Sequence, residues 1–205
     1  LLVVNTTPVG MYPKCPASVV AEDDLAALPE LRGVLDVVYN PRRTGICLAA
    51  ERLGLPWQSG LAMLVAQALF SSELFQGTPL DRSLVGAIER EILSQTANVV
   101  LIGMPGVGKT TTGRALAHLL GRPFVDLDDA FRLEFGTSAA DFIRAHGETE
   151  FRVRETRVAA DYGSRSSLVV ACGGGIVTQP RNYDLLHQNG TIVQLDRPAE
   201  QLSQA

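Results

Sequence analysis

"NVVLIGMPGVGKTTTGRAL", residues 98–116, decides the fold class of the second half of the chain. An apolar run leads into a glycine-rich turn, and a helical pattern follows a Lys-Thr pair. The spacing from Gly103 to Gly108, Lys109 and Thr110 is G-x-x-x-x-G-K-T, which between a strand and a helix is typical of a phosphate-binding loop. Glycines let backbone N–H groups approach a ligand closely, and the positive end of the following helix attracts an anion.

The side chains of this loop predict how a nucleotide would be held. Lys109 would reach the β- and γ-phosphates, and the Thr110 hydroxyl would ligate Mg²⁺. ATP with Mg²⁺ is therefore the expected ligand, and a glycine-rich turn without a ligand is the alternative. GTPases, ATP motors and small-molecule kinases share such a loop, so it does not identify the acceptor. The residues expected to bind ATP are Gly103, Gly106, Val107, Gly108, Lys109, Thr110 and Thr111.

The composition is that of a globular protein without a strong field of one sign. The chain has 205 residues, of which 46% are hydrophobic and 20% charged, and its formal net charge is -4. This charge gives no reason to expect nucleic acid as a partner, and no apolar run approaches the ~20 residues that a membrane span needs. The three cysteines are odd in number and far apart, which suits a reducing cytosol, so we expect a cytoplasmic protein.

Strands alternate with helices along the chain, which predicts an α/β fold with a parallel sheet. The apolar run at 60–77 predicts a buried amphipathic helix that Gly77 closes. A second helix is predicted at 83–96. These two helices interrupt the alternation, so we place a domain boundary between residues 78 and 97. The apolar stripe of the second helix is Leu84, Ile88 and Ile92. The predicted strands lie within 1–5, 33–41, 98–103, 122–131, 167–175 and 190–198, and further helices within 44–56, 109–121 and 138–163.

Two carboxylates follow the apolar residues of the strand that starts near residue 122. Asp126 and Asp128 lie two residues apart in "VDLDD", at a strand end that faces the ligand crevice of a parallel sheet. One carboxylate could attend Mg²⁺ or accept a hydroxyl proton, and the other could bind hydroxyl groups of an acceptor. The alternative is that Asp128 or Asp129 only caps the next helix. The residues alone leave both interpretations open.

An arginine and three glycines add to this acceptor side. Arg152 and Glu155 lie three apart in a predicted helix and can share a face, so Glu155 could hold a guanidinium that binds a carboxylate. The alternative is an exposed ion pair of little energetic value. The glycines at 173–175 follow a buried strand and would let backbone N–H groups approach a ligand, or they form a plain loop. Cys172 is expected to be a small core residue.

In order and approximate spacing, the phosphate loop, "FVDLD", "HGETEFRVRE" and "CGGG" resemble shikimate kinase over residues 97–205. The resemblance implies a P-loop kinase with a parallel sheet like that of nucleoside-monophosphate kinases. It implies transfer of the γ-phosphoryl group of ATP to the 3-hydroxyl of shikimate. Lys109 and Asp126 would be catalytic, Asp126 lying near Mg²⁺ and the accepting hydroxyl. Arg152 would take the shikimate carboxylate, and Asp128 the ring hydroxyls. The residues expected to bind this substrate are Asp128, Arg152, Glu155, Gly173, Gly174 and Gly175.

The ends of the chain depart from this family. The family continues into a mobile lid that carries an arginine over the phosphates, and a further substrate arginine follows the lid. This chain ends in the helix expected after "TIVQLDRPAE", and it starts inside an apolar run at Leu1, without Met. We therefore expect a piece of a longer protein that binds ATP but turns it over poorly, because lids exclude water and complete the charge clamp.

Residues 1–95 carry a second resemblance. "VVNTTPVGMYP", "DVVYNPRRTGICLAAERLG" and "SGLAMLVAQALFSSELFQG" resemble, in this order, the C-terminal half of shikimate dehydrogenase, which ends an NADP-binding Rossmann domain. Ala62 stands where that family commonly has Gly. The catalytic Lys and Asp of the family and its dinucleotide loop would precede Leu1, so this part alone is not expected to reduce dehydroshikimate. The resemblance puts Asn5, Thr6, Thr7, Val37 and Gly60 on the NADP side, and Tyr39 and Gln67 on the shikimate side.

The two resemblances together predict three parts and one parent protein. Residues 1–77 would be the C-terminal half of the dehydrogenase, 78–96 a helical linker or its last helix, and 97–205 a truncated kinase domain. Both families act on shikimate in consecutive steps of aromatic amino-acid (chorismate) biosynthesis, so we expect a bifunctional cytoplasmic parent. Its expected partner is the small molecule shikimate, not nucleic acid or membrane. The alternatives are another P-loop small-molecule kinase, or a module that binds ATP without turnover.

Overall fold

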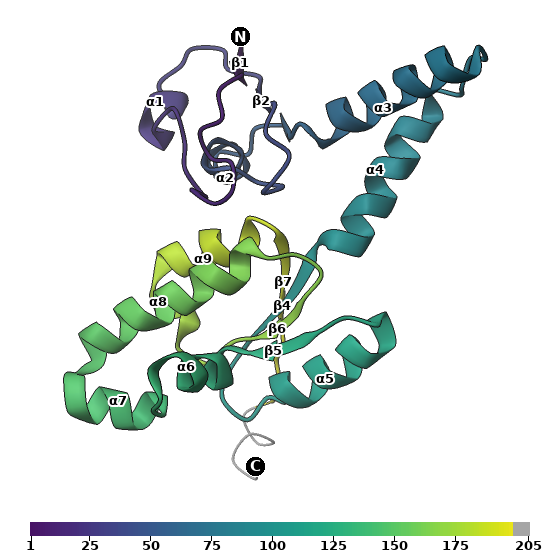
Figure 1. The fold of residues 1–205 in the computed structure, drawn as a ribbon. Helices are drawn as coiled ribbons and strands as arrows, with labels where there is room; N and C mark the ends of the chain where they lie inside the picture. The colour runs from purple at the N-terminus through teal and green to yellow at the C-terminus, as the bar shows by residue number, and fades with distance from the viewer. Residues whose placement is uncertain (199–205) are drawn as a thin grey trace. The chain divides into compact units, whose positions relative to one another are not determined.

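The chain forms two compact units, Leu1–Gln95 and Thr96–Ala205. The computed structural model describes residues 1–198 (Figure 1). Each unit has its own β-sheet, and every strand pair in both sheets is parallel. This confirms the α/β class that the alternation of strands and helices predicts.

The first unit is built on a three-stranded sheet. β1 (Leu2–Asn5), β2 (Gly33–Asp36) and β3 (Trp57–Gln58) lie in the order β1-β2-β3. The apolar runs predict β1 and β2, whereas the two-residue β3 is not predicted. The helix α2 (Gly45–Arg52) packs on β2 and β3, and α1 (Glu22–Ala26) packs on α2. The buried core of the unit consists of Leu25, Val34, Ile46, Cys47, Ala49 and Ala50.

Two longer helices follow at the predicted places, α3 (Leu61–Gln76), which Gly77 closes, and α4 (Ser83–Thr96). The expectation that the first of them is buried is wrong. Leu74 and Phe75 of α3 are 85% and 91% exposed. None of the residues of α4 is buried, so its predicted apolar stripe is not covered. Apolar residues occur on all sides of α3, which is typical of a buried helix, but the rest of the described unit covers only one narrow stripe of it. The buried residues of that stripe are Leu61, Val65 and Leu69.

The second unit holds a four-stranded sheet in the order β5-β6-β4-β7. The strands are β4 (Asn98–Ile102), β5 (Phe124–Asp126), β6 (Val169–Ala171) and β7 (Gly190–Gln194). The strand β4 pairs with β6 on one side and with β7 on the other. Because the strands are parallel, their carboxyl ends meet at one edge of the sheet. Ligands of open α/β sheets bind at this edge, where the strand order reverses.

Helices cover both faces of this sheet. Figure 1 shows α8 and α9 side by side on one face and α5 on the other. The ring of Phe131 lies 5.4 Å from that of Phe142 and 5.1 Å from that of Phe151, so this cluster joins α6, α7 and α8. The helices α6 and α8, which carry the candidate acceptor residues, are thereby held in place. The helices are α5 (Lys109–Leu120), α6 (Leu127–Phe135), α7 (Ala139–His146), α8 (Glu148–Ser164) and α9 (Pro180–His187), with a short 3-10 turn, η1 (Ile176–Thr178), before α9.

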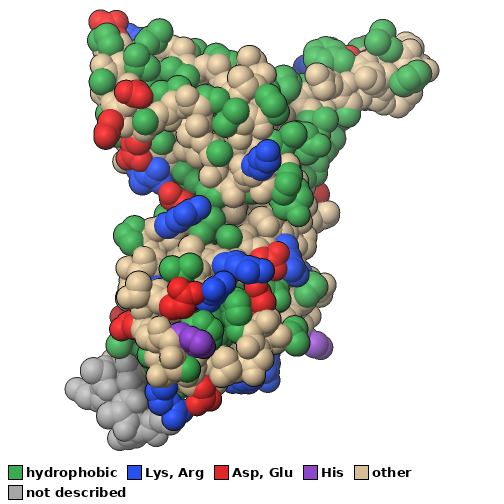
Figure 2. All heavy atoms as spheres, turned by 60° about the vertical axis from the view of Figure 1, so that its left-hand side comes forward, with side chains coloured by type: hydrophobic (Ala, Val, Ile, Leu, Met, Phe, Trp, Pro, Cys, Tyr) green, Lys and Arg blue, Asp and Glu red, His purple; other side chains and the backbone are tan. Residues whose placement is uncertain are grey.

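The surface carries charges of both signs. On the face shown in Figure 2, Lys and Arg side chains are interspersed with Asp and Glu side chains. No helix within residues 1–198 has both the length and the apolar character that crossing a membrane requires.

The close packing of α8 on α9 predicts a large effect of one methyl group. A Cβ on Gly163 of α8 would overlap the backbone carbonyl of Leu185 in α9. We expect Gly163→Ala to lower the free energy of unfolding by about 1–3 kcal/mol, because backbone atoms would have to move apart. Urea unfolding followed by circular dichroism measures this change.

The matched control is Gly86→Ala in α4. A Cβ there would have only the flexible end of Arg90 within 4 Å, at 3.6 Å from Nη1. The substitution should be neutral or stabilise the helix by up to about 1 kcal/mol. A Gly163→Ala variant as stable as this control would contradict the packing.

Candidate active site

A glycine-rich loop joins the end of β4 to the start of α5. Gly103, Gly106 and Gly108 have φ angles of 145°, 80° and 98°. These angles lie in the left-handed region, which glycine enters without strain and other residues avoid. Backbone conformation therefore explains why glycine occupies these three positions of the loop. Val107 is buried beside the loop, and Thr111 is exposed on the first turn of α5.

The side chain of Lys109 lies across the start of this loop. Its Nζ donates hydrogen bonds to the carbonyl oxygens of Gly103 at 2.8 Å and Met104 at 2.9 Å. Only 9% of the residue is exposed. An ammonium group has three N–H donors, so one remains for an anion. A buried ammonium beside the N-terminus of α5 provides the positive potential that a phosphate group needs.

Thr110 and Asp126 bring two oxygen atoms together next to the loop. The Thr110 hydroxyl donates a hydrogen bond to Asp126 Oδ2 at 2.8 Å. The other oxygen, Oδ1, accepts the backbone N–H of Asp128 at 3.1 Å and caps the N-terminus of α6. The suggestion that Asp128 or Asp129 caps this helix is therefore wrong. Because Asp126 is the cap, the Asp128 carboxylate remains available for a ligand.

The Thr110–Asp126 pair suits a magnesium ion. Mg²⁺ is commonly held by one or two oxygen ligands of a protein, together with phosphate oxygens and water. Within residues 1–198, no cluster of three or more His, Cys, Asp or Glu side chains is arranged to hold a metal. The pair therefore fits an ion that arrives with a nucleotide better than a metal held by protein ligands alone.

The three glycines that follow β6, at 173–175, leave room for three different neighbours. A Cβ on the first would lie 2.8 Å from Oδ1 of Asp128 on α6. A Cβ on the second would lie 2.8 Å from Cδ of Pro105 in the phosphate loop. A Cβ on the third would lie 2.5 Å from Nη1 of Arg152 on α8. None of these glycines has a positive φ, so close approach, and not backbone conformation, explains why glycine is needed.

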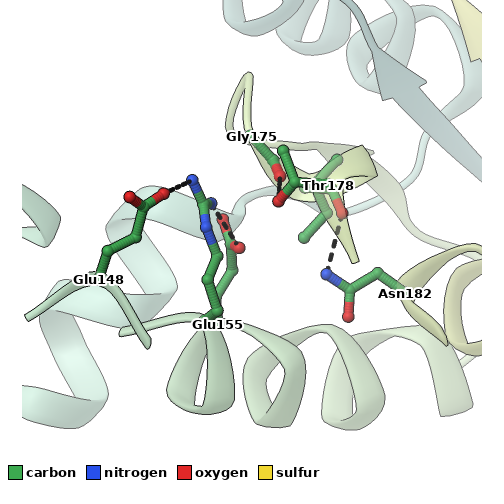
Figure 3. A network of polar contacts seen from close by, with 7 residues as sticks. Glu148, Glu155, Gly175, Thr178 and Asn182 are labelled. Carbon is green, nitrogen blue, oxygen red and sulfur yellow. Dashed lines mark hydrogen bonds and ion pairs between the residues drawn. The ribbon is translucent and has the colours of Figure 1, made fainter. Parts of the chain in front are cut away.

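Arg152 is held by two carboxylates of its own helix. Its Nη1 donates to Glu155 Oε2 and its Nη2 to Glu148 Oε1, each at 2.9 Å (Figure 3). The Glu155 side chain is 9% exposed and that of Glu148 is 68% exposed, so Glu155 is the buried anchor of the pair. A guanidinium has five N–H donors, and these two bonds leave three for a ligand. The expected link from Arg152 to Glu155 is present. Glu148 is not predicted, although its i, i+4 spacing to Arg152 is a signal for it.

Burial and neighbouring charges change the proton affinities in this site. Burial raises the pKa of Asp128, and the negative charge of Asp126 raises it further, while Lys109 opposes the change. Burial also raises the pKa of Glu155, although its hydrogen bond from Arg152 lowers it. Burial raises the pKa of the Cys172 thiol to about 12. That thiol stays protonated and acts as a small core residue, as the sequence predicts.

Hydrogen bonds fix the chain just after the glycines. The Thr178 hydroxyl donates to the carbonyl oxygen of Gly175 at 2.8 Å, and Nδ2 of the buried Asn182 donates to that of Ile176 at 2.9 Å (Figure 3). A groove of about 730 Å³ lies between α8 and this segment, and Arg152 lines it. A small polar molecule can therefore reach the guanidinium from solvent.

In the first unit, several predicted residues gather at the carboxyl ends of β1 and β2. A pocket of about 410 Å³ there is lined by Thr6, Thr7, Val37 and Tyr39, among others. Gly60 lies against this region because a Cβ on it would overlap the Val37 carbonyl. The other two residues predicted for this site, Asn5 and Gln67, lie elsewhere.

Asn5 and Gln67 do not line this pocket. Asn5 is buried behind it and accepts hydrogen bonds from the backbone N–H of Thr7 at 3.0 Å and from its hydroxyl at 2.7 Å. Gln67 is exposed on α3 and is not brought together with Tyr39 in the pocket. Asn5 therefore shapes the loop after β1, which carries the lining threonines.

Asp36 is the residue of this unit that the sequence analysis missed. It is 3% exposed. Its Oδ1 accepts from Asn5 Nδ2 at 3.1 Å and from the backbone N–H of Val38 at 2.9 Å, and its Oδ2 accepts from the Thr44 hydroxyl at 2.5 Å. These bonds tie together the ends of β1 and β2 and the start of α2. A lone carboxylate within the apolar run "GVLDVV" is the signal that could have found it.

Known proteins resemble the second unit closely. The family model for shikimate kinase matches residues 105–205. A shikimate kinase of Parasynechococcus marenigrum (strain WH8102) is 48% identical over 107 residues, which cover 52% of this chain and 56% of that protein. The solved shikimate kinase of Acinetobacter baumannii, in complex with shikimate, is 41% identical with a TM-score of 0.53, over 56% of this chain and 64% of that one.

The first unit has a weaker counterpart. A solved shikimate dehydrogenase of Peptoclostridium difficile is 34% identical over 44% of this chain and 33% of that one, with a TM-score of 0.40. A TM-score of this size does not establish a common fold. The chain also spans little more than half the length of the curated kinases that it matches, 56% and 57% in two of them. These matches alone therefore do not assign the activity of a complete kinase to this chain.

The raised pKa of Asp128 predicts a gain in stability when its charge is removed. A carboxyl group whose pKa is raised by folding binds its proton more tightly in the folded chain, so its ionised form lowers stability at neutral pH. We expect Asp128→Asn to raise the melting temperature near pH 7. The gain should shrink as the pH falls through the raised pKa towards the ordinary value of 3.8. Thermal unfolding over a range of pH measures both effects.

The control is the neighbouring Asp129→Asn. Asp129 forms an exposed ion pair with Arg132, whose two side chains are 59% and 61% exposed. Such pairs contribute about 0–1 kcal/mol, so this variant should change little or lose stability slightly. A melting temperature of Asp128→Asn at or below the wild-type value near neutral pH would show that the ionised Asp128 carboxylate does not destabilise the fold.

Proposed function

We propose that the second unit is a shikimate kinase domain, which transfers the γ-phosphoryl group of ATP to the 3-hydroxyl of shikimate. The observation that carries the proposal is the close approach of three elements at glycines 173–175. These are the phosphate loop, Asp128 on α6 and Arg152 on α8. A nucleotide on the loop would present its terminal phosphate to a molecule held by these two side chains. The match of residues 105–205 to the shikimate kinase model supports the same assignment.

The residues on the nucleotide side would act by position and charge. Lys109 would bind the β- and γ-phosphates, and Thr110 and Asp126 would hold Mg²⁺, which neutralises charge on the phosphates. Asp126 would also lie near the accepting hydroxyl and take its proton. Phosphoryl transfer needs little covalent chemistry from the protein, so alignment and electrostatic stabilisation supply most of the acceleration.

The residues on the acceptor side would select a hydroxylated acid. Arg152 keeps three N–H donors beyond its two bonds to glutamates, which is enough for a bidentate grip on a carboxylate. Glu155 would orient this guanidinium from the buried side. Asp128 accepts hydrogen bonds when ionised and suits ring hydroxyls. Gly174 and its neighbours leave their backbone N–H groups accessible to the same molecule.

Two other functions would use the same phosphate loop. One is a P-loop kinase for another small molecule, and the other is a module that binds ATP without transfer. An acceptor without a carboxylate would not need a guanidinium anchored by two glutamates, which favours an acidic acceptor. A module that only binds ATP would not need the Asp128 carboxylate next to the loop, where burial and Asp126 disfavour its ionised form and raise its pKa.

We further propose that residues 1–77 are the C-terminal half of a shikimate dehydrogenase, with 78–96 as a linker or its last helix. The pocket at the carboxyl ends of β1 and β2 supports this, because dinucleotides bind at such ends of parallel strands. Thr6, Thr7 and Val37 would lie on the NADP side and Tyr39 on the shikimate side. A parent that joins this part to the kinase at 97–205 would be a bifunctional cytoplasmic enzyme of aromatic amino-acid biosynthesis.

Arg152→Lys tests the carboxylate grip. A lysine offers a point charge in place of a planar fork, so we expect shikimate affinity to fall about tenfold or more while ATP affinity is unchanged. Isothermal titration calorimetry of the 205-residue chain measures both affinities. Shikimate methyl ester, which has no carboxylate, should bind weakly and equally to wild type and variant.

The control Arg154→Lys lies on the same helix, where Arg154 pairs with Glu150 at 2.7 Å and is 40% exposed. It should leave both affinities unchanged. Lys109→Ala should abolish ATP binding and retain shikimate binding. Formation of shikimate 3-phosphate and ADP, followed by ³¹P NMR, tests the transfer itself. Equal shikimate affinity of Arg152→Lys and Arg154→Lys would refute the role of Arg152.

A titration with NADP⁺ tests the proposal for the first unit. We expect the amide signals of Thr6, Thr7, Val37 and Tyr39 to shift in ¹H–¹⁵N NMR spectra, because these residues line one pocket. The signals of Arg52 and Glu22, which pair at 2.7 Å, should not shift. Because the dinucleotide loop of the family would precede Leu1, binding is expected to be weak, and shifts spread evenly over the unit would contradict a cofactor site here.

A further inference from the structure

The chain that leaves β7 runs along the phosphate loop. The register of β4 and β7 extends from Asn98 opposite Gly190 to Ile102 opposite Gln194. The next residue, Leu195, continues it, because its backbone N–H donates to the carbonyl oxygen of Ile102 at 2.8 Å. The carbonyl oxygen of Leu195 lies so close to Gly103, the first glycine of the loop, that a Cβ on this glycine would overlap it. Two backbone contacts therefore fix where this segment passes the loop.

Two residues further on, Arg197 reaches the last glycine of the loop. Its Nη2 lies 3.4 Å and its Cζ 3.9 Å from the position that a Cβ would take on Gly108. Gly108 is the N-cap of α5 and has a φ of 98°. The guanidinium therefore lies at the N-terminus of α5, where the helix dipole does not stabilise a positive charge. Within residues 1–198, no ion pair of Arg197 with an acidic side chain accounts for this position.

Two cations then stand at opposite ends of the same loop. Lys109 Nζ is bonded to the carbonyls at the start of the loop, while the Arg197 guanidinium lies at its end. The Asp128 carboxylate interacts electrostatically with Lys109, and that of Asp126 accepts a hydrogen bond from Thr110 in the first turn of α5. The exposed Asp196 adjoins Arg197 in the chain. A cation at each end of the loop suits an anion bound between them, and the Arg197 side chain is exposed and therefore open to a ligand from solvent.

We propose that Arg197 is a nucleotide-binding residue, which donates a charged hydrogen bond to a phosphate oxygen of the nucleotide on the loop. The proposal rests on the proposed function of the second unit. The backbone of the loop and Lys109 supply the general phosphate site, and Arg197 adds donors at the α5 end. Because a guanidinium has its donors in a fixed plane, it can bind two phosphate oxygens through two parallel hydrogen bonds, a geometry that an ammonium does not offer. Arg197 lies outside the motifs from which the site was predicted.

Arg197→Gln tests this role in the 205-residue chain. Hydrogen bonds to charged groups are stronger than those between neutral groups, so we expect ATP and ADP to bind about tenfold more weakly or worse. Inorganic tripolyphosphate, which has no base, should lose affinity by a similar factor. Arg197→Lys should keep part of the affinity. Shikimate affinity and the melting temperature should not change, which separates a binding role from a structural one.

The control is Arg144→Gln on α7, where Arg144 is 77% exposed and pairs with Asp141. It should bind ATP like the wild type. ATP affinity of Arg197→Gln equal to this control would overturn the proposal. Loss of ATP affinity without loss of tripolyphosphate affinity would overturn the phosphate contact and favour contact with the base. Wild type that fails to bind ATP would refute the proposed function as well, whereas loss only in Lys109→Ala would refute the role of Arg197 alone.

Discussion

Three adjacent positions without side chains hold the candidate active site together. The glycines after β6 let Asp128, Pro105 and Arg152 approach the same short stretch of backbone to within 2.5–2.8 Å of where Cβ atoms would lie. These neighbours come from three elements that are far apart in the chain. A methyl group on Gly174 would push against the phosphate loop, and one on Gly173 or Gly175 would displace the end of the Asp128 or Arg152 side chain. The arrangement of the phosphate loop, Asp128 and Arg152 around this stretch thus depends on the absence of side chains, and hydrogen bonds from Thr178 and Asn182 fix the chain that carries it.

The electrostatics of the site follow from this proximity. Asp128 is placed next to Asp126 because both belong to the turn that starts α6, and their repulsion adds to burial in raising the pKa of Asp128. Cations nearby offset part of this repulsion. A cluster of carboxylates that is unfavourable for folding is favourable for binding hydroxyl groups and a divalent cation, which is the usual conflict between stability and activity.

The local parts of this architecture could be predicted from the sequence, and the parts made by tertiary contact could not. The strand, loop and helix around Lys109 follow from spacing and glycine conformation, which are properties of neighbouring residues. The capping of α6 by Asp126 and the contact of Glu148 with the guanidinium are also local, two and four residues from their partners, whereas the bonds of Asp36 to Asn5 and Thr44 depend on which atoms meet in space. The helix α9 starts at Pro180, and proline is favoured in a first helical turn, so the start of this helix is also a local signal in the sequence. The exposure of α3 could not be predicted. Its apolar composition shows that the helix could be buried, but not whether other elements pack against it.

The two halves of the site differ in how they are held, and this difference separates their functions. The phosphate loop is fixed by backbone conformation at three glycines and by the Lys109 bonds to main-chain carbonyls, so side-chain changes elsewhere alter it little. The acceptor half is fixed by side chains on α6 and α8, chiefly the Arg152 pairs with Glu148 and Glu155. In the proposed kinase domain, substitutions on those helices would therefore change which acid is bound without changing the nucleotide. Selectivity for the acceptor would reside in a few ion pairs, and phosphate binding in the course of the main chain.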